Sequence, residues 1–349
     1  MTASLVSRHL GVGDIFPYVQ LETADGRSRV LAQFAGRPLL VHLCAAQPVG
    51  ADAGKSSFLS SLFEICQDLS NLNVKLILIA RTSDQPRDAP PLGGSNSNPD
   101  YEWLKDANGS VASAFNLREV GSTLLLNENQ RVVGVFDPRA DSLEKADILS
   151  AVRSLLPERP GFSEARTHAP VLRVPSVFDP SCCRHLIDIF ENSAHQPSGF
   201  NEQRQDGTPL VFDDKVKKRR DFVVESKTAL AEQIRVIYLR RIVPEIAKAF
   251  HFEVKSHEAF KLARYDAEDR GFFRAHRDNT SSVNAHRRFA VSINLNTEEH
   301  EGGHLIFPEY CNAGYRPATG EAVVFCCSLL HEARPVTKGS RYVQLAFLY

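Results

Sequence analysis

Apolar positions in the first half of the chain alternate between strand-like and helix-like patterns. Two mostly apolar runs, 38–44 and 74–80, are long enough for buried strands. Between them, residues 56–69 place apolar side chains at close to helical spacing. Two shorter apolar runs, 122–126 and 132–136, flank a polar segment and predict a hairpin. This order predicts an α/β domain with at least one βαβ crossover.

The second half of the chain changes from helical patterns to short strands. A strand-like run over 171–178 precedes a helix over 180–192, for which Asp179 is the expected N-cap. A longer helical pattern follows at about 226–250. From residue 253 onwards, short apolar strands alternate with turns that contain Gly, Asn and Asp. This pattern predicts an α+β domain with a β-barrel or jelly-roll core.

A proline-containing break separates the two halves. Residues 157–162 end a helical pattern that runs over 142–156, because proline interrupts a helix. We therefore expect one domain over 1–156, a linker over 157–170 and a second domain over 171–349. A length of 349 residues is also more than a single core usually covers.

Composition and charge narrow the class of protein. The hydrophobic fraction of 43% and the charged fraction of 24% are typical of a soluble globular chain. No apolar run reaches the roughly 18 residues that a membrane span requires. A formal net charge of −1 gives no general attraction for nucleic acid, so we expect neither nucleic acid nor membrane as a partner.

Cysteine usage and the first residues bear on the compartment. The seven cysteines include no CxxC pair, and the chain does not start with a basic segment followed by an apolar one. We therefore expect reduced thiols and a cytoplasmic location.

One short segment carries residues suited to metal binding. His276 and Asp278 lie two apart, and side chains two apart in a strand share one face. His331 follows a mostly apolar run over 322–330 and is a third candidate ligand. Two histidines and a carboxylate on one face of an iron leave the opposite positions open, as in non-haem Fe(II) oxygenases. The His-x-Asp pair alone is a weak signal, and zinc more often occupies a closed tetrahedral site.

Arg341 strengthens the metal hypothesis. By strand alternation it shares a face with Val343, Leu345 and Phe347, which points the arginine toward a core. A buried guanidinium needs an anion, and a carboxylate is its natural partner. A bound ligand could supply that carboxylate. A structural ion pair with a distant acidic residue, or a surface position, are the alternatives from spacing alone.

Several motifs in this half occur in the order that one oxygenase family shows. They are Tyr265 followed by His276 and Asp278, the run 288–296, the Gly-Gly segment 301–308, and the segment from His331 to Arg341. With these motifs, residues 253–349 resemble the prolyl-4-hydroxylase-like group of 2-oxoglutarate- and Fe(II)-dependent oxygenases.

The resemblance implies a fold, a cofactor and a reaction. It implies a double-stranded β-helix that binds Fe(II) and the cosubstrate 2-oxoglutarate and uses O2 to hydroxylate a C–H bond, with release of succinate and CO2. The substrate would be a peptide or protein, prolyl by analogy, or a small molecule. The resemblance implies metal ligation by His276, Asp278 and His331, and cosubstrate contacts by Arg341, Tyr265 and Asn294.

The first half resembles the peroxiredoxin branch of the thioredoxin-like fold, over roughly residues 10–155. A peroxidatic cysteine should follow the first buried strand at the start of a helix, which lowers its pKa. Residues 50–54 occupy that place and contain no cysteine. We expect a catalytically silent module for contacts, through which any homo-oligomer would form. Two alternatives stay open: a thiol peroxidase whose second domain is regulatory, and a non-enzymatic metal-binding interaction module.

A basic run, 215–220, precedes a predicted strand over 221–224. A solvated loop is the expected reading of such a run. The functional alternative is a lip of the active site that receives an acidic or polymeric substrate.

Overall fold

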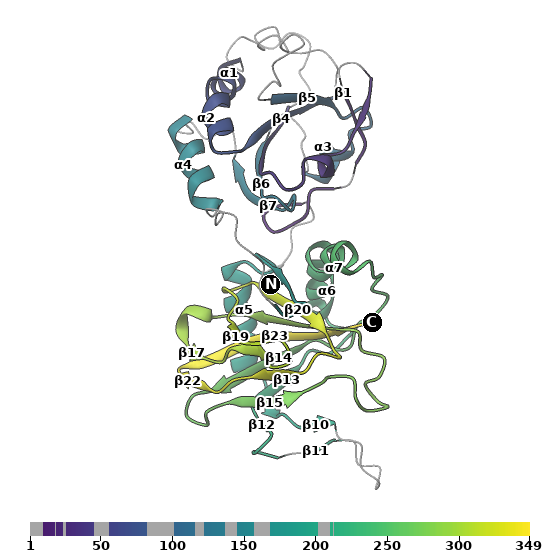
Figure 1. The fold of residues 1–349 in the computed structure, drawn as a ribbon, viewed down its shortest axis with the longest axis vertical. Coiled ribbons are helices and arrows are strands. Elements are labelled where there is room, and N and C mark those ends of the chain that lie inside the picture. The colour runs from purple at the N-terminus through teal and green to yellow at the C-terminus, as the bar shows by residue number, and fades with distance from the viewer. Residues whose placement is uncertain are drawn as a thin grey trace. The chain divides into compact units, whose positions relative to one another are not determined.

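The computed structural model forms two compact units, one within Ser7–Phe162 and the other within Ser163–Tyr349 (Figure 1). The structure describes residues 10–17, 19–23, 26–44, 56–81, 101–115, 122–136, 145–156, 168–201, 210–211 and 213–349. Most of the linker predicted over 157–170 and the segment 50–54 lie outside these residues.

One seven-stranded sheet is the centre of the first unit, in the order β2-β1-β5-β4-β3-β6-β7. Its strands are β1 (Leu21–Thr23), β2 (Ser28–Arg29), β3 (Leu39–Leu43), β4 (Lys75–Ala80), β5 (Tyr101–Lys105), β6 (Ser122–Leu126) and β7 (Val132–Phe136). β3, β4 and β5 are parallel, and the other pairs are antiparallel. The predicted buried strands, the crossover between them and the hairpin are all confirmed.

Helices cover both faces of this sheet, because both faces are apolar. The helical elements are η1 (Leu31–Phe34), α1 (Ser56–Glu64), α2 (Cys66–Asn71), α3 (Ser110–Ala114) and α4 (Lys145–Leu155). Leu62, Leu69 and Ile148 of α1, α2 and α4 belong to the core on one face. Leu31 and Val111, from η1 and α3, belong to the core on the other. The helical pattern over 56–69 thus forms two short helices rather than one.

Two antiparallel sheets form the framework of the second unit. Their orders are β8-β20-β16-β23-β14-β13-β9 and β12-β15-β21-β18-β19, with β10–β11 and β17–β22 as separate pairs. The strands are β8 (Leu172–Val174), β9 (Gln196–Pro197), β10 (Phe200–Asn201), β11 (Leu210–Val211), β12 (Lys217–Lys218), β13 (Arg220–Val223), β14 (Lys261–Asp266), β15 (Phe272–His276), β16 (Phe289–Asn294), β17 (Glu301–Gly302), β18 (Leu305–Phe307), β19 (Cys311–Tyr315), β20 (Ala322–Cys326), β21 (His331–Ala333), β22 (Val336–Lys338) and β23 (Ser340–Leu348).

Three helices support the larger sheet: α5 (Pro180–Glu191), α6 (Ala229–Arg241) and α7 (Val243–Phe250), and a short helix, η3 (Thr297–Glu299), follows β16. Asp179 accepts a hydrogen bond from the backbone N–H of Cys182, which confirms it as the N-cap of α5. The single helix predicted over 226–250 is wrong in detail. The first helix, α6, ends at Arg241 with Ile242 as its C-cap, and α7 begins at Val243 with Pro244 in its first turn, because proline lacks the N–H that a continuous helix needs.

The two faces of the larger sheet have different partners. Ala346 and Leu348 of β23 pack in the core that includes α5, α6 and α7. Val343 of the same strand belongs to a core cluster with Ala333 of the smaller sheet. The alternation predicted for this strand is therefore confirmed, with Arg341 on the side that faces the smaller sheet.

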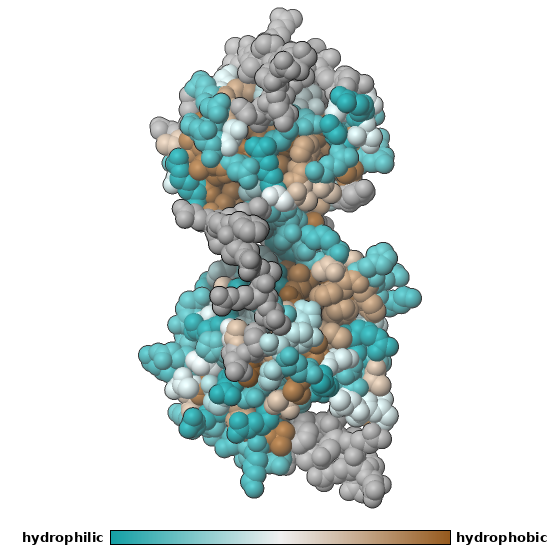
Figure 2. Space-filling model, viewed as in Figure 1, coloured by the Kyte–Doolittle hydropathy of each residue, from teal (hydrophilic) through white to brown (hydrophobic). Residues whose placement is uncertain are grey.

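The surface in the view of Figure 2 is mainly hydrophilic on each unit, with small hydrophobic areas between polar residues. Among the residues that the structure describes, no helix has the length and apolar character needed to span a membrane.

Candidate metal centre

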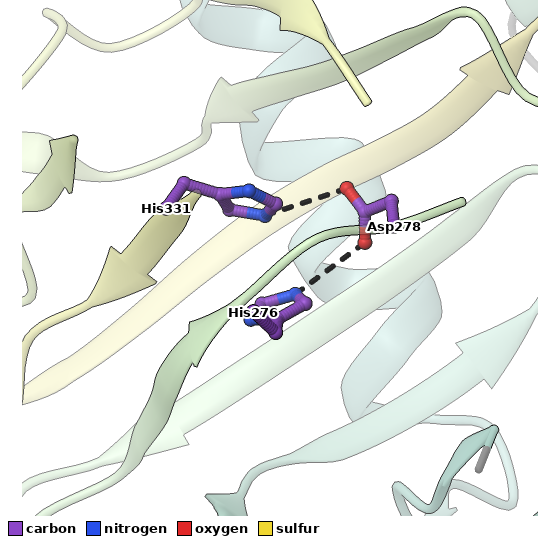
Figure 3. A group of neighbouring side chains, drawn as sticks. All are labelled: His276, Asp278 and His331. Atoms are coloured by element: carbon purple, nitrogen blue, oxygen red, sulfur yellow. Dashed lines mark ion pairs between the residues drawn. The ribbon is translucent and has the colours of Figure 1, made fainter. Parts of the chain in front are cut away.

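His276, Asp278 and His331 lie together between the two sheets (Figure 3). His276 ends β15 and His331 begins β21, and these two residues are direct partners in the antiparallel pairing of the strands. Asp278 follows β15, where its backbone N–H donates to the carbonyl of Cys327 at 2.9 Å. Strand pairing therefore brings together candidate ligands that lie more than fifty residues apart in the chain.

The side chains of the three residues converge. Asp278 Oδ1 is 3.4 Å from His276 Nε2, and Asp278 Oδ2 is 3.4 Å from His331 Nε2. All the candidate ligand atoms lie within 4.8 Å of one another. Two ligand atoms at right angles on a metal, with bonds of about 2.1 Å, lie about 3 Å apart. The three residues thus fit a single divalent cation bound on one face.

Backbone carbonyls orient both imidazoles. His276 Nδ1 lies 2.7 Å from the carbonyl oxygen of Arg274, and His331 Nδ1 lies 3.0 Å from that of Leu329. A carbonyl only accepts, so each Nδ1 must carry the proton. Each Nε2 is then left with a lone pair toward the shared centre, as metal-bound histidines generally require.

Electrostatics keep Asp278 and His331 in the protonation states that bind a cation. Burial lowers the pKa of His331 to about 4, so this imidazole is neutral near pH 7. Burial opposes ionisation of Asp278, but the nearby His331 and His276 hold the pKa of this carboxyl well below its usual range. The site therefore combines the neutral imidazole of His331 with one buried carboxylate, whose charge a metal would balance.

A cavity of about 360 Å³ extends from the triad between the sheets. Phe273 stacks on His276 with 3.5 Å between ring centroids, and Phe325 lies edge-on to His331 at 4.6 Å. These apolar rings limit the access of water to the imidazoles.

Arg341 lines the same cavity and is only 4% exposed. Its Nε and Nη2 donate to Asn294 Oδ1 at 3.2 and 2.9 Å. Among the described residues, no carboxylate forms an ion pair with it. Burial lowers the pKa of Arg341, yet a guanidinium stays charged in proteins. The alternatives of a surface arginine and a structural ion pair within the described residues do not hold, and the buried charge is available to a ligand anion.

Tyr265 and Asn294 flank this guanidinium in different ways. Tyr265 lines the cavity, and its ring centroid lies 5.5 Å from the Arg341 guanidinium carbon. Asn294 lies behind the arginine, where its side-chain amide donates to Thr297 Oγ1 and the Pro317 carbonyl. Its carbonyl oxygen therefore fixes the orientation of Arg341.

Part of the basic run 215–220 is not the solvated loop that the sequence indicates. Lys217 is buried, and Lys217 and Arg219 both line the cavity. Arg219 forms a bidentate ion pair with Asp221, at 2.7 and 3.0 Å, and donates to Tyr265 Oη at 3.0 Å. The reason is a long-range one: β12 pairs with β15, which places Lys217 opposite Phe273.

Lys261 and Arg287 also line the cavity and were not singled out from the sequence. Lys261 lies four residues before Tyr265 on β14, so strand alternation would have placed it on the same face. Arg287 forms a bidentate ion pair with Glu258 and donates to the backbone carbonyl of Asp278 at 3.2 Å. It lies in a loop, where no local pattern indicates direction.

One family model matches part of the second unit. Residues 260–349 match the family model described as the 2OG-Fe(II) oxygenase superfamily. No curated protein matches the chain.

Three solved structures are similar to parts of the chain. A Pseudomonas putida prolyl-4-hydroxylase has 14% identity and a TM-score of 0.39, over 52% of this chain and 92% of its own. A Trichoplax adhaerens prolyl hydroxylase, in complex with a hypoxia inducible factor peptide fragment, has 15% identity and a TM-score of 0.38, over 52% and 83%. A reduced 2-Cys peroxiredoxin from Plasmodium vivax has 17% identity and a TM-score of 0.32, over 42% and 96%.

The family match spans the whole constellation described above, from Tyr265 through the triad to Arg341. The resemblance seen in the C-terminal motifs is therefore confirmed, and residues 260–349 form a domain of the 2OG-Fe(II) oxygenase superfamily.

Proposed function

We propose that this protein is an Fe(II)- and 2-oxoglutarate-dependent dioxygenase that hydroxylates a C–H bond and releases succinate and CO2. The observation that carries the proposal is one cavity that holds both the His276–Asp278–His331 triad and the buried Arg341. A carboxylate-binding arginine beside a facial triad is what a dicarboxylic cosubstrate of a ferrous enzyme requires.

Each group in the cavity has a defined part in this proposal. His276, Asp278 and His331 hold the metal, which supplies the oxidative chemistry when it is bound. Arg341 receives the far carboxylate of 2-oxoglutarate, and Asn294 keeps the guanidinium in position. Tyr265 lies beside that carboxylate position, and its hydroxyl is held by Arg219. Phe273 and Phe325 shield the centre from water.

The domain arrangement is part of the same proposal. Residues 171–349 would be a double-stranded β-helix with its supporting helices, and residues 1–156 a thioredoxin-like module joined to it by a linker over 157–170. The first domain would serve contacts rather than chemistry. Two facts support this: residues 45–55 contain no cysteine, and burial raises the pKa of the nearby Cys44 thiol to about 12, far from a reactive thiolate.

Substrate-stimulated succinate formation tests the proposed function. The full chain would be incubated with Fe(II), 2-oxoglutarate and O2, alone and with pools of proline-containing peptides and small molecules. We expect at least one pool to increase succinate, and we expect His276→Ala to abolish both the increase and Fe(II) binding. His304→Ala, in a turn outside the triad, is the matched control and should retain both. Retention of Fe(II) binding in His276→Ala would refute the assignment of the metal site.

A further inference from the structure

The cavity around the triad is strongly basic. Asp278 is the one acidic side chain among the described residues that line it. The basic residues that line it are Lys217, Arg219, Lys261, Arg277, Arg287 and Arg341. A shielded cavity with this imbalance favours an anion.

Most of these cations have partners within the protein. Arg219 pairs with Asp221, Arg287 with Glu258, and Arg277 with Glu309. Lys217 donates to the carbonyl of Gly199 at 2.7 Å, and its Nζ lies 4.7 Å from the Phe273 ring centroid. Arg341 is the arginine that the proposed function assigns to the cosubstrate.

Lys261 is different from these five. Its Nζ makes neither an ion pair nor a hydrogen bond with any residue in the described part of the chain. Its one direct partner there is the ring of Phe347, with 6.0 Å between Nζ and the ring centroid. Arg219 and Arg287 line the same cavity as Lys261, and each is already paired with a carboxylate, Asp221 and Glu258 respectively.

The position of Lys261 separates it from the cosubstrate site. Tyr265 is the strand partner of Arg341, whereas Lys261 is the partner of Leu345. Four residues along a strand correspond to roughly 13 Å. A ligand held by Arg341 at one end of the cavity therefore leaves the Lys261 ammonium available at the other.

We propose that Lys261 binds a carboxylate of the primary substrate, so that the enzyme acts on an acidic substrate. This inference rests on the proposed function, because it takes the metal and cosubstrate to occupy the triad and Arg341. The carboxylate belongs either to an Asp or Glu near the reacting residue of a peptide or to a small organic acid. The ammonium then orients the substrate against the triad, and it is a specificity-determining residue rather than a metal or cosubstrate ligand.

Binding measured without turnover tests this inference. The full chain is loaded with Mn(II) and 2-oxoglutarate under anaerobic conditions and immobilised. One arm offers a randomised pool of proline-containing peptides, and the other offers small carboxylic acids together with their carboxamides. We expect acidic members to be retained at least about tenfold better than matched neutral ones in one arm, which identifies the source of the carboxylate.

Substitutions assign that preference to Lys261. Lys261→Met should abolish the preference for acids, and Lys261→Arg should retain it. Lys255→Met, at an exposed lysine outside the cavity, is the matched control and should behave as the parent protein. Equal retention of acids and amides in both arms, or an acid preference that survives in Lys261→Met, overturns the inference.

Two further measurements separate this inference from the function on which it rests. If Lys261→Met weakens binding of 2-oxoglutarate instead, Lys261 is a cosubstrate anchor and the inference is wrong. If the parent protein binds neither Mn(II) nor 2-oxoglutarate, the proposed function itself fails. Normal binding of both ligands without acid preference refutes the substrate inference alone.

Discussion

At the scale of single residues, the site depends on charges that the protein leaves only partly compensated. Arg341 is 4% exposed and has an amide oxygen as its partner, where a buried guanidinium would ordinarily have a carboxylate. Asp278 is 8% exposed and contacts the imidazoles of His276 and His331. A cation would balance the charge of the carboxylate, and a dicarboxylate would balance that of the guanidinium.

Arg341 gives the first prediction at this scale. Arg341→Ala should raise the 2-oxoglutarate concentration for half-saturation at least about tenfold, because a shielded, charge-assisted contact is lost. Isothermal titration calorimetry with Mn(II)-loaded protein would measure the affinity for 2-oxoglutarate. Mn(II) affinity should stay within about twofold of the parent, since the arginine is not a ligand in the proposal. An unchanged requirement for 2-oxoglutarate would contradict the role given to this residue.

The lowered pKa of Asp221 makes the stability of the fold depend on pH. Burial would raise the pKa of this carboxyl, but Arg219, with smaller contributions from Lys217 and Ser198, outweighs burial and lowers the pKa from 3.8 to about 2. Because the folded-state pKa is the lower one, the ion pair stabilises the fold above about pH 4. This contribution is lost as the pH falls toward 2. The shift corresponds to about 2 kcal/mol at neutral pH, of which about half remains at pH 3.

The comparison of Asp221→Asn with the parent protein isolates this contribution. Urea unfolding followed by far-ultraviolet circular dichroism should show the variant less stable by about 2 kcal/mol at pH 7, and by about half that at pH 3. Trp103, the single tryptophan, lies in the first unit, so its fluorescence follows the unfolding of that unit separately. A difference that stays constant between the two pH values would argue against the ionised pair.

At the scale of elements, the turn at Gly303 determines whether the Arg341 side chain has room to pack. Gly303 follows β17 with φ of +66°, and a Cβ there would lie 2.8 Å from Arg341 Cδ. The glycine is needed both for its left-handed backbone and for this close approach. The side chain of Arg341 thus packs against the Gly-Gly segment noted in the sequence.

Gly303→Ala should therefore weaken 2-oxoglutarate binding without loss of Mn(II) binding, because it displaces Arg341 and leaves the triad alone. Gly26→Ala is the matched control: it also has a positive φ, of +80°, but open space around the added carbon. Both variants should lose about 1–2 kcal/mol of stability from backbone strain, and only the first should change cosubstrate affinity. Equal cosubstrate affinity in the two variants would contradict the packing argument.

Some of these elements could be predicted from the local sequence pattern, and others could not. The alternation along β23 and the hairpin of β6 and β7 follow from residues next to each other, and both are confirmed. The break between α6 and α7 at Ile242 could have been anticipated from Pro244. The inward direction of Lys217 could not, because it depends on the pairing of β12 with β15.

At the scale of the whole molecule, each of the two units has its own hydrophobic core. The triad, Arg341 and the cavity all belong to the second unit. In the first, Cys44 follows β3, and burial raises the pKa of its thiol to about 12. The first unit is therefore proposed to take no part in the chemistry.

Cys44→Ser tests that separation. Succinate formation in the full chain should stay within about twofold of the parent, because a thiol of such high pKa supplies almost no thiolate. Arg341→Ala, assayed in parallel at limiting 2-oxoglutarate, is the control variant in which succinate formation should fall. A collapse of succinate formation in Cys44→Ser would instead favour the thiol peroxidase alternative.

Which residues could face a core, and which chemistry they could bring, follows from the order of the amino acids alone. Period-two alternation is local, so the inward side of β23 needs no tertiary information. Asp278 lies beyond the end of β15, so strand alternation does not place it beside His276; its backbone N–H donates to the carbonyl of Cys327. Tertiary structure decided which strands pair, and hence that His331 lies opposite His276. It also decided that Lys261 and Arg219 share a cavity with Arg341, because long-range pairing depends on packing between segments that no local pattern specifies.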